Sequence, residues 1–280
     1  MLYAKSGADI STGVTDIWML TKTDDSWGNP KKMTSPISSL SREASACMTL
    51  DNTIYFSSNR NCEGIENCYT ADLFSSKLEG GTYQNTELIA ELASASDEES
   101  VFISPKADFI IFCRFTNDKT WMDLYISYRD VNNDWIAPIM LDSSINSKDW
   151  DRRPFVTLDN SFLFFTRLQF EENTLVESDI YWVNTSKVFK PFVFNSLSDK
   201  ILKVGEKFEI EVPSNYFKDI NDELLTLELN QEDFDWLTFD AKQMKLSGVP
   251  SQEGDFELTF TATDTSLNNT EDKVVIRVVK

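Results

Sequence analysis

Short apolar runs separated by polar turns recur along the first two thirds of the chain. Four of these runs share one phrase, in which an acidic residue precedes two or more apolar or aromatic residues: Asp16-Ile17-Trp18-Met19-Leu20, Asp72-Leu73-Phe74, Asp123-Leu124-Tyr125-Ile126 and Asp179-Ile180-Tyr181-Trp182. The four acidic residues follow one another at intervals of 56, 51 and 56 positions. A fixed period of this length, filled with strand-like segments only, is typical of an array of repeated β units.

Each repeat contains further segments whose sequence predicts a strand. An apolar strand precedes each phrase, at Leu2-Tyr3-Ala4, Ile54-Tyr55-Phe56-Ser57, Phe109-Ile110-Ile111-Phe112 and Phe162-Leu163-Phe164-Phe165. Three of these strands follow turns at residues 49–52, 104–107 and 157–160, where Asp, Asn or Pro favours a reversal. A third strand ends before each turn, at Met48, Ile103 and Val156, and a fourth follows the phrase. Four antiparallel strands per repeat predict the blade of a β-propeller.

The order of these motifs resembles the TolB-like (WD40-like) propellers of bacteria. The matching segments are the Trp-x-x-Pro loops at 27–30 and 135–138, Ile145-Asn146-Ser147, Tyr55-Phe56-Ser57-Ser58-Asn59-Arg60 and Asp179-Ile180-Tyr181. The resemblance covers residues 1–195 and implies a binding or scaffolding role without a reaction. The first repeat begins at Leu2 without its inner strand, so we expect three full blades and most of a fourth. Since such propellers usually close with six blades, an open arc or a piece of a longer propeller is predicted, with an exposed strand edge.

From residue 196 the phrase disappears and alternating strands follow, at Lys207-Phe208-Glu209-Ile210-Glu211-Val212, Glu257-Leu258-Thr259-Phe260-Thr261-Ala262 and Val274-Val275-Ile276-Arg277-Val278-Val279. Strands at this spacing over about 80 residues predict an immunoglobulin-like β-sandwich. The segment resembles the dystroglycan-type, cadherin-like Ig domain of secreted and surface proteins. The residues that carry this resemblance include Val204-Gly205-Glu206, Phe217-Lys218-Asp219, Asp235-Trp236-Leu237-Thr238-Phe239-Asp240, Leu246-Ser247-Gly248-Val249-Pro250 and Ala262-Thr263-Asp264. The fold prediction is thus all-β, with propeller blades at 1–195 and a sandwich at 196–280.

Composition excludes several classes of function. The chain has 26 basic and 46 acidic residues, a net charge of −20, which disfavours nucleic acid and anionic membranes as partners. It has no histidine, so Ser-His-Asp and Cys-His catalysis and histidine-ligated metals are excluded. No apolar run reaches the roughly 18 residues of a membrane span. The first residues lack the basic start and apolar stretch of a signal peptide, so we expect none in this chain.

Calcium is one candidate ligand. Asp219, Asn221, Asp222 and Asp264 fall where the cadherin-like resemblance places oxygen ligands, at one end of the sandwich. Carboxylate and amide oxygens are the ligands that Ca²⁺ prefers. The alternative is that Asp219 and its neighbours form a solvated turn and that Asp264 caps a loop through backbone bonds.

Three acidic residues occupy equivalent positions in the repeats. Glu43, Glu98 and Asp151 each lie six positions before the first turn residue, at the start of the predicted inner strand. Propeller glycosidases use carboxylates on inner strands, so these three residues define an alternative function as a glycosidase or sialidase-like enzyme. Against it, catalytic carboxylates need different environments, whereas one acid per blade suggests that each acid belongs to the blade itself.

Other side chains near these acids could contact a ligand. Arg42, Arg152 and Arg153 could clamp a carboxylated sugar or neutralise the neighbouring acids. Trp150, between Asp149 and Asp151, is the aromatic residue that we expect to face a ligand, while the other tryptophans are expected to pack between blades.

The positions of the four cysteines indicate the cellular compartment of the protein. Cys62 and Cys68 bracket a short loop between two predicted strands, and we predict a disulfide between them, which implies an oxidising environment. Cys47 and Cys113 lie on apolar strands, and the spacing of the four cysteines does not fit paired zinc ligands.

These observations favour a non-catalytic binding or scaffold module outside the cytoplasm, in the periplasm, at the cell surface or secreted. The expected partner is a protein or a glycan, with calcium as a possible cofactor in the second domain and no nucleic acid or membrane insertion. We expect the segment to be part of a longer multidomain chain.

Overall fold

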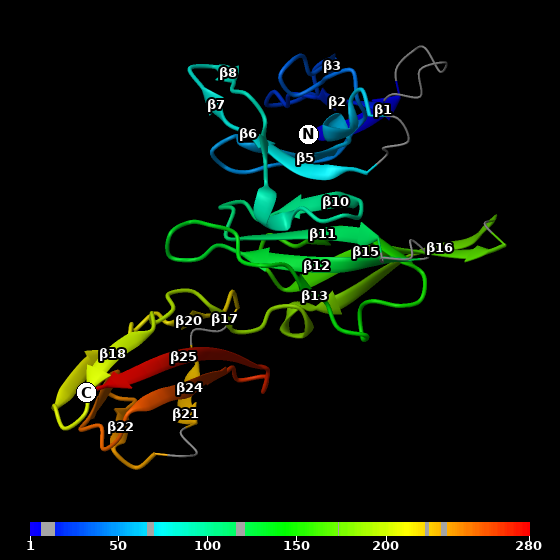
Figure 1. Cartoon of the computed structure of the whole chain (residues 1–280). Coiled ribbons are helices and arrows are strands. Elements are labelled where there is room, and N and C mark those ends of the chain that lie inside the picture. Colours follow the sequence, from blue (N-terminus) through cyan, green and yellow to red (C-terminus); the bar gives the residue numbers. More distant parts are fainter. Residues whose placement is uncertain (7–14, 66–69, 116–120, 173, 222–223, 231–233) are drawn as a thin grey trace. The chain divides into compact units, whose positions relative to one another are not determined.

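The computed structural model of the chain is all-β, as predicted, and divides into two compact units (Figure 1). It describes residues 1–6, 15–65, 70–115, 121–172, 174–221, 224–230 and 234–280. The first unit comprises Met1–Arg129 and Trp135–Asn184, and the second comprises Asp130–Asp134 and Thr185–Lys280. The predicted domain division lay at residue 195, whereas the compact units divide after Asn184. Three short 3₁₀ turns are the helical elements of the described residues (Arg60–Cys62, Ala90–Leu92 and Thr185–Lys187), and none is long enough to cross a membrane.

The first unit consists of four antiparallel repeats, called repeats 1 to 4 below. Repeat 1 contains β1 (Leu2–Ser6), β2 (Thr15–Met19) and β3 (Lys31–Lys32). Repeat 2 contains β4 (Glu43–Met48), β5 (Ile54–Ser58), β6 (Asp72–Ser76) and β9 (Glu87–Leu88), with a hairpin of β7 (Leu78–Glu79) and β8 (Thr82–Tyr83). Repeat 3 contains β10 (Glu98–Ile103), β11 (Phe109–Phe115), β12 (Met122–Tyr128) and β13 (Ile139–Met140). Repeat 4 contains β14 (Trp150–Val156), β15 (Phe162–Glu171) and β16 (Thr174–Asn184).

Among the described residues, repeats 2 and 3 have all four expected strands, and repeats 1 and 4 have three each. The expectation of a fourth strand in repeat 4 was wrong, because the chain after β16 enters the second unit and its next strand pairs there. A single parallel bridge between Met122 and Trp150 joins repeats 3 and 4 into one sheet. None of the sheets formed by the described strands closes into a barrel.

The predicted turns between the inner strand and the next strand are present. Asn52, Ala107 and Asn160 occupy equivalent turn positions and adopt positive φ angles of 64°, 60° and 56°. In repeat 4 the Thr157 hydroxyl donates to Oδ1 of Asp159 at 2.6 Å, which fixes the start of the turn. Asn and Asp favour such turns because they tolerate left-handed backbone and bond locally.

Each inner strand also carries a β-bulge. The pairing register shifts within β4, β10 and β14, and the residues in the bulges, Ser45, Ser100 and Arg153, have φ angles of 51°, 54° and 55°. A bulge bends its strand and redirects the side chains on either side of it. The inner strands of repeats 2, 3 and 4 therefore share a bulge at the same position.

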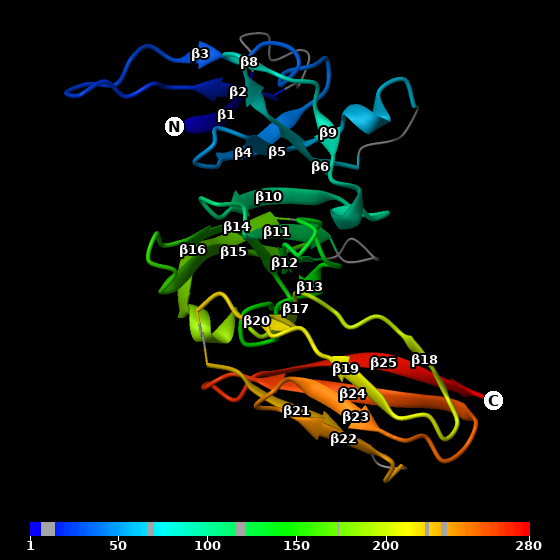
Figure 2. The ribbon, with the colours of Figure 1, turned by 90° about the vertical axis from the view of Figure 1, so that its left-hand side faces the viewer.

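The repeats pack face to face, and Figure 2 shows β1 to β3, then β4 to β6, then β10 to β12 as successive layers. Ile17 belongs to one apolar cluster with Ile54 and Phe56 of repeat 2, and Leu73 belongs to another with Val101 and Ile110 of repeat 3. Both side chains are almost fully buried, because the following repeat covers them. Stacking of this kind gives the first unit its apolar core.

The second unit is a β-sandwich. One sheet has the order β18 (Lys200–Lys203), β25 (Asn269–Val279), β24 (Gly254–Thr263) and β21 (Thr226–Asn230), and the other has β19 (Phe208–Glu211), β23 (Lys245–Gly248) and β22 (Leu237–Asp240). A short pair is formed by β17 (Phe192–Val193) and β20 (Phe217–Lys218). Along β25, Val274, Ile276 and Val278 are buried, and they alternate with more exposed residues. The predicted alternating strands therefore supply the core.

Candidate functional site

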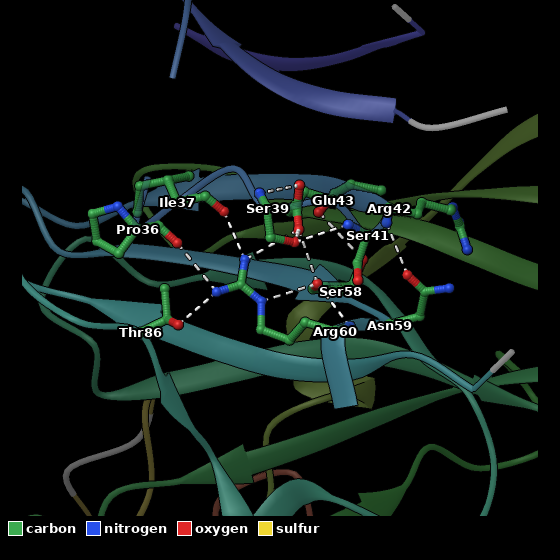
Figure 3. Close-up of polar contacts among 12 residues, drawn as sticks. Pro36, Ile37, Ser39, Ser41, Arg42, Glu43, Ser58, Asn59, Arg60 and Thr86 are labelled. Atoms are coloured by element: carbon green, nitrogen blue, oxygen red, sulfur yellow. Dashed lines mark hydrogen bonds and ion pairs between the residues drawn. The ribbon is translucent and has the colours of Figure 1, made fainter. Parts of the chain in front are cut away.

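In repeat 2 the predicted site residue Glu43 is fully buried and bonded to its own repeat (Figure 3). Its Oε1 accepts hydrogen bonds from the hydroxyls of Ser39 and Ser58, at 2.5 and 3.2 Å, and from the guanidinium of Arg60 at 3.2 Å. Its Oε2 accepts from the backbone N–H of Ser39 at 3.1 Å. The carboxylate is therefore neutralised and held in place by nearby groups.

The same arrangement recurs in repeats 3 and 4. Glu98 accepts from the Ser94 hydroxyl and from Nε of Arg114, the latter at 2.7 Å. Asp151 accepts from the hydroxyl of Ser147 at 2.8 Å and from Nε of Arg167 at 2.8 Å. Each guanidinium also donates to a backbone carbonyl: Arg60 to Ile37, Arg114 to Leu92 and Arg167 to Ile145. We call these three groups the acid–arginine modules of repeats 2 to 4.

Aromatic rings complete each module. The Arg114 guanidinium lies 5.5 Å from the ring centroid of Phe112 and 4.8 Å from that of Tyr125, and these two rings are stacked. Arg60 lies over Phe56 and Phe74, and Arg167 over Phe165 and Tyr181, in the same way. The arginine thus binds an acid with its edge while its face rests on apolar rings. The role of these arginines was not predicted from the sequence, although each lies 16 or 17 positions after its acid.

The acid–arginine module of repeat 3 differs from the other two modules in how well the charge of its acid is compensated. Oε2 of Glu98 is buried and has no hydrogen-bond partner among the described residues. Burial raises the pKa of Glu98, partly offset by Ser94 and Arg114. On β12, which is separated from the strand of Glu98 by β11, burial and then the charge of Asp151 raise the pKa of Asp123 to about 6. Carboxylate charge is therefore less well compensated in this part of the first unit.

A second ion-pair network joins three repeats. Oε1 of Glu99 lies 2.5 Å from a guanidinium nitrogen of Arg42, and Oε2 lies 2.8 Å from one of Arg152. These residues come from repeats 2, 3 and 4, so one buried glutamate links two neighbouring inner strands to its own. Glu99 was not identified from the sequence.

This network borders a cavity of about 380 Å³ in the first unit. The described residues that line the cavity are Leu2, Tyr3, Ala4, Arg42, Ala44, Ser45, Ala46, Cys47, Glu99, Ser100, Val101, Arg152, Arg153 and Pro154. All three bulge residues belong to this lining, so the bulges turn the inner strands toward the cavity. Its charged side chains are three arginines and one glutamate, an excess of positive charge in a chain of net charge −20.

The structure separates the predicted ligand residues into two groups. Arg42, Arg152 and Arg153 line the cavity, whereas Glu43, Glu98 and Asp151 are not among the described lining residues. Trp150, the aromatic residue expected to face a ligand, packs against Phe115 and Phe170 with ring centroids 4.9 and 4.7 Å apart. The predicted arginines therefore line the cavity, whereas the three predicted acids are bonded within their own repeats.

The predicted calcium ligands make local contacts. Oδ1 and Oδ2 of Asp264 accept from the backbone N–H and the side-chain amide of Asn268, at 2.8 and 2.7 Å. Oδ1 of Asp219 accepts from the backbone N–H of Asn221 at 3.0 Å. Asp222 lies outside the described residues, and within the described ones no group of three or more acidic or cysteine side chains is arranged to hold a metal. Calcium binding stays a prediction.

The cysteines fall into two classes. Cys62 is disulfide-bonded, and its predicted partner Cys68 lies outside the described residues. Cys47 and Cys113 are free thiols. Burial raises the pKa of Cys47 to about 11 and that of Cys113 to about 12.

Comparison with known proteins identifies the second unit. Residues 190–279 match the family model He_PIG, described as a Putative Ig domain, so the C-terminal unit is an immunoglobulin-like domain. No curated protein matches the sequence.

Several solved structures align with parts of this chain. A putative alpha-galactosidase from Bacteroides fragilis aligns with 32% of this chain and 18% of its own, at 22% identity and a TM-score of 0.26. The extracellular domain of a putative one-component system from B. thetaiotaomicron aligns with 94% of this chain and 36% of its own, at 9% identity and a TM-score of 0.31. A puromycin-hydrolyzing peptidase of Mycobacterium tuberculosis aligns with 96% and 44%, at 8% identity and a TM-score of 0.36. The chain spans less than two thirds of the length of each of these proteins.

Proposed function

We propose that this chain is a non-catalytic binding module that works outside the cytoplasm. In this proposal the first unit is an open arc of TolB-like propeller blades, and its cavity binds a carboxylate group carried by a protein or a glycan. The single observation that carries the proposal is the cluster of Arg42, Arg152 and Arg153 in one cavity.

The arginines of the cavity have hydrogen-bonding capacity to spare. Arg153 is exposed and forms no ion pair with any described residue, and Nε of Arg152 is buried without a hydrogen-bond partner in the described part of the chain. A guanidinium presents paired N–H groups that match the two oxygens of a carboxylate. Charge repulsion by the acidic surface is screened beyond roughly 8 Å at physiological salt, so recognition depends on these short contacts.

Two further observations support a location outside the cytoplasm and a non-catalytic role. The disulfide at Cys62 and the immunoglobulin-like domain are typical of proteins outside the reducing cytoplasm. Glu43, Glu98 and Asp151 are fully buried and paired with arginines, an arrangement that suits support of the repeats better than attack on a glycosidic bond.

The proposal is tested by calorimetric titration of the full chain with uronic acid oligosaccharides, acidic peptides and their neutral counterparts. We expect binding of the carboxylated ligands only. Arg153→Ala is expected to weaken it at least about tenfold, because it removes charge-assisted hydrogen bonds. Arg277→Ala, which breaks an exposed ion pair in the second unit, is the matched control and leaves binding unchanged. Equal binding of the neutral ligands would contradict the proposal, and hydrolysis of a glycan that is lost in Asp151→Asn would favour the glycosidase alternative.

A further inference from the structure

The cavity of the first unit offers few side chains that bind the hydroxyl groups of a sugar. Apart from Glu99, Arg152 and Arg153, the lining residues on β4, β10 and β14 are small or apolar, namely Ala44, Ser45, Ala46, Cys47, Ser100, Val101 and Pro154. The described lining includes no Asn, Gln, Asp, Thr or Trp. A sugar carries several hydroxyl groups, and each one that is buried without a hydrogen-bond partner costs free energy. The lining therefore favours a ligand that has one charged group and a small apolar part.

The bulges of the inner strands add backbone groups to the cavity. The pairing register of each inner strand skips two residues at its bulge, and all of these residues line the cavity: Ser45 and Ala46, Ser100 and Val101, and Arg153 and Pro154. Ser45, Ser100 and Arg153 have positive φ angles. Successive backbone N–H groups in such turn-like conformations form concave sites for anions. The cavity therefore presents main-chain groups to a ligand as well as guanidinium groups.

The three arginines of the cavity differ in what they already bind. Glu99 holds guanidinium nitrogens of Arg42 and Arg152 at 2.5 and 2.8 Å, so it fixes one arginine from the repeat before its own and one from the repeat after it. Arg153 is exposed and forms no ion pair with any described residue, and 38% of the Arg42 side chain is exposed. A ligand carboxylate can therefore bind Arg153 without breaking an existing ion pair, next to two guanidinium groups that Glu99 keeps in place.

We propose that the cavity binds the C-terminal carboxylate of a partner protein whose last residue is small and apolar. The carboxylate binds Arg153, and the last side chain lies among the small residues of β4, β10 and β14. This inference rests on the proposed function and narrows its ligand from any carboxylate to the end of a polypeptide chain. The volume of about 380 Å³ is near the lower limit of the roughly 300–1,000 Å³ that is usual for ligand sites, so it suits a chain end better than a chain that continues on both sides. Capture of a terminal carboxylate by backbone groups is a recurring mode of peptide recognition.

The probe is the peptide Gly-Ser-Gly-Ala-Val with a fluorophore at its N-terminus and a free C-terminal carboxylate. Fluorescence anisotropy measures its binding to the full chain, and we expect saturable binding below about 1 mM. The same peptide with a C-terminal amide lacks the charge and is expected to bind at least tenfold more weakly. The amidated peptide Gly-Ser-Asp-Ala-Val carries the same net charge in a side chain, and it is expected to bind as weakly as the first amide.

The last residue of the peptide tests the apolar part of the cavity. A free-acid peptide that ends in tryptophan in place of valine is expected to bind at least fivefold more weakly, because the small lining residues leave limited room. A peptide that ends in aspartate is expected to be weakened to a similar degree, because its second carboxylate lies among apolar groups and is repelled by Glu99.

Two substitutions in the cavity separate the effect of charge from that of space. Arg153→Ala is expected to remove the difference between the free acid and its amide, and Arg277→Ala in the second unit is its control. Ala44→Leu narrows the cavity and is expected to weaken binding of the peptide that ends in valine at least fivefold, with a smaller effect on one that ends in glycine. Ala137→Leu makes the same change at an exposed position outside the described lining and is expected to leave binding unchanged. Thermal melting verifies that each variant is folded, and Arg153→Gln is a second, milder variant.

Other outcomes overturn the inference. If the amidated peptide with an aspartate binds as tightly as the free acid, a side-chain carboxylate is sufficient, so the inference falls and the proposed function stands. The same holds if uronic acid oligosaccharides bind through Arg153 and the free-acid peptide does not bind up to about 1 mM. Binding of the free acid that is insensitive to Arg153→Ala would place the peptide elsewhere and overturn the inference. If neither the peptide nor the oligosaccharides bind, both the inference and the proposed function fall.

Discussion

Arg114 donates from Nε to Oε1 of Glu98 at 2.7 Å, and the glutamate has no exposed side-chain surface. The pair lies between two adjacent strands, with the guanidinium resting on Phe112 and Tyr125. Since Glu98 has no contact with water, its charge depends on this single cation and on the Ser94 hydroxyl. The acid–arginine modules are therefore sites where removal of one partner has a large effect on folding.

Replacement of Arg114 by alanine is expected to lower the free energy of unfolding of the first unit by about 3–5 kcal/mol, because it leaves a buried carboxylate unpaired. Denaturant titration followed by tryptophan fluorescence measures the loss. The additional change Glu98→Gln is expected to recover part of it by removing the buried charge. Arg277→Ala serves as the control, since its ion pair is exposed, and should have little effect. An equally small effect of Arg114→Ala would show that Glu98 is solvated.

Asp123 should make the stability of the first unit depend on pH. Its pKa is raised to about 6 from the ordinary value of 3.8, first by burial and then by the charge of Asp151, so the folded state binds the proton more tightly than the unfolded state. Its ionisation therefore costs stability as the pH rises from about 4 to about 6. Asp123→Asn is expected to remove this loss, which is about 3 kcal/mol for a rise of about two pKa units. Unfolding free energies of the two proteins at pH 4 and pH 7 test this, and parallel curves would contradict it.

Gly248 is expected to tolerate no side chain. A Cβ atom at this position would lie 2.0 Å from the carbonyl oxygen of Trp236, and its three nearest neighbours are all backbone atoms of Trp236 and Leu237, which cannot rotate away as a side chain could. Gly248→Ala should therefore destabilise the immunoglobulin-like unit by about 3 kcal/mol or more. Gly28→Ala is the control, because its nearest neighbour, the carbonyl oxygen of Thr21, lies at 3.4 Å. A melting temperature of Gly248→Ala equal to that of the wild type would contradict this packing.

Cys47 should report on occupation of the cavity. Cys47 is one of the residues that line the cavity. Burial raises the pKa of its thiol to about 11 from 9.0, so at pH 8 the thiolate fraction is about a hundredfold lower than in the unfolded chain. Alkylation measured by mass spectrometry should accordingly be slow and should accelerate as the pH rises. A bound carboxylated ligand is expected to slow it further, whereas Cys113, which does not line the cavity, should be unaffected. Rapid alkylation of Cys47 at pH 8 would contradict this environment.

The calcium prediction is tested by melting the chain in EDTA and in millimolar calcium. A site of micromolar affinity formed by Asp219, Asn221, Asp222 and Asp264 would add on the order of 4 kcal/mol at a thousandfold excess of calcium. Asp264→Ala should abolish that shift. Coincident curves would mean that Asp264 serves to hold Asn268, a contact present without metal.

Local features of the first unit were predictable from sequence. The strands, the turns and the position of the acids follow from apolar alternation and from turn residues, because these depend on neighbours along the chain. Asn52 and Asn160 lie in left-handed turns for this reason. The partners of the acids were not predicted, since Arg114 and Arg167 reach them across a strand pair, and the sequence does not mark which arginine will do so.

Contacts between repeats also could not be predicted from the sequence. Glu99 and Arg152 are 53 positions apart and meet only because two inner strands border one cavity. Ile180 has the same place in the repeated phrase as Ile17 and Leu73, yet 76% of it is exposed, because no described repeat follows β16 to cover it.

The sequence by itself determined an all-β chain of repeated units followed by an immunoglobulin-like domain, because period, alternation and turn chemistry are properties of adjacent residues. The tertiary structure decided which acids are paired with which arginines and which arginines face the cavity. Those features depend on how separate repeats pack. Packing brings together residues that are far apart in the sequence, and the sequence does not show which of them will be in contact.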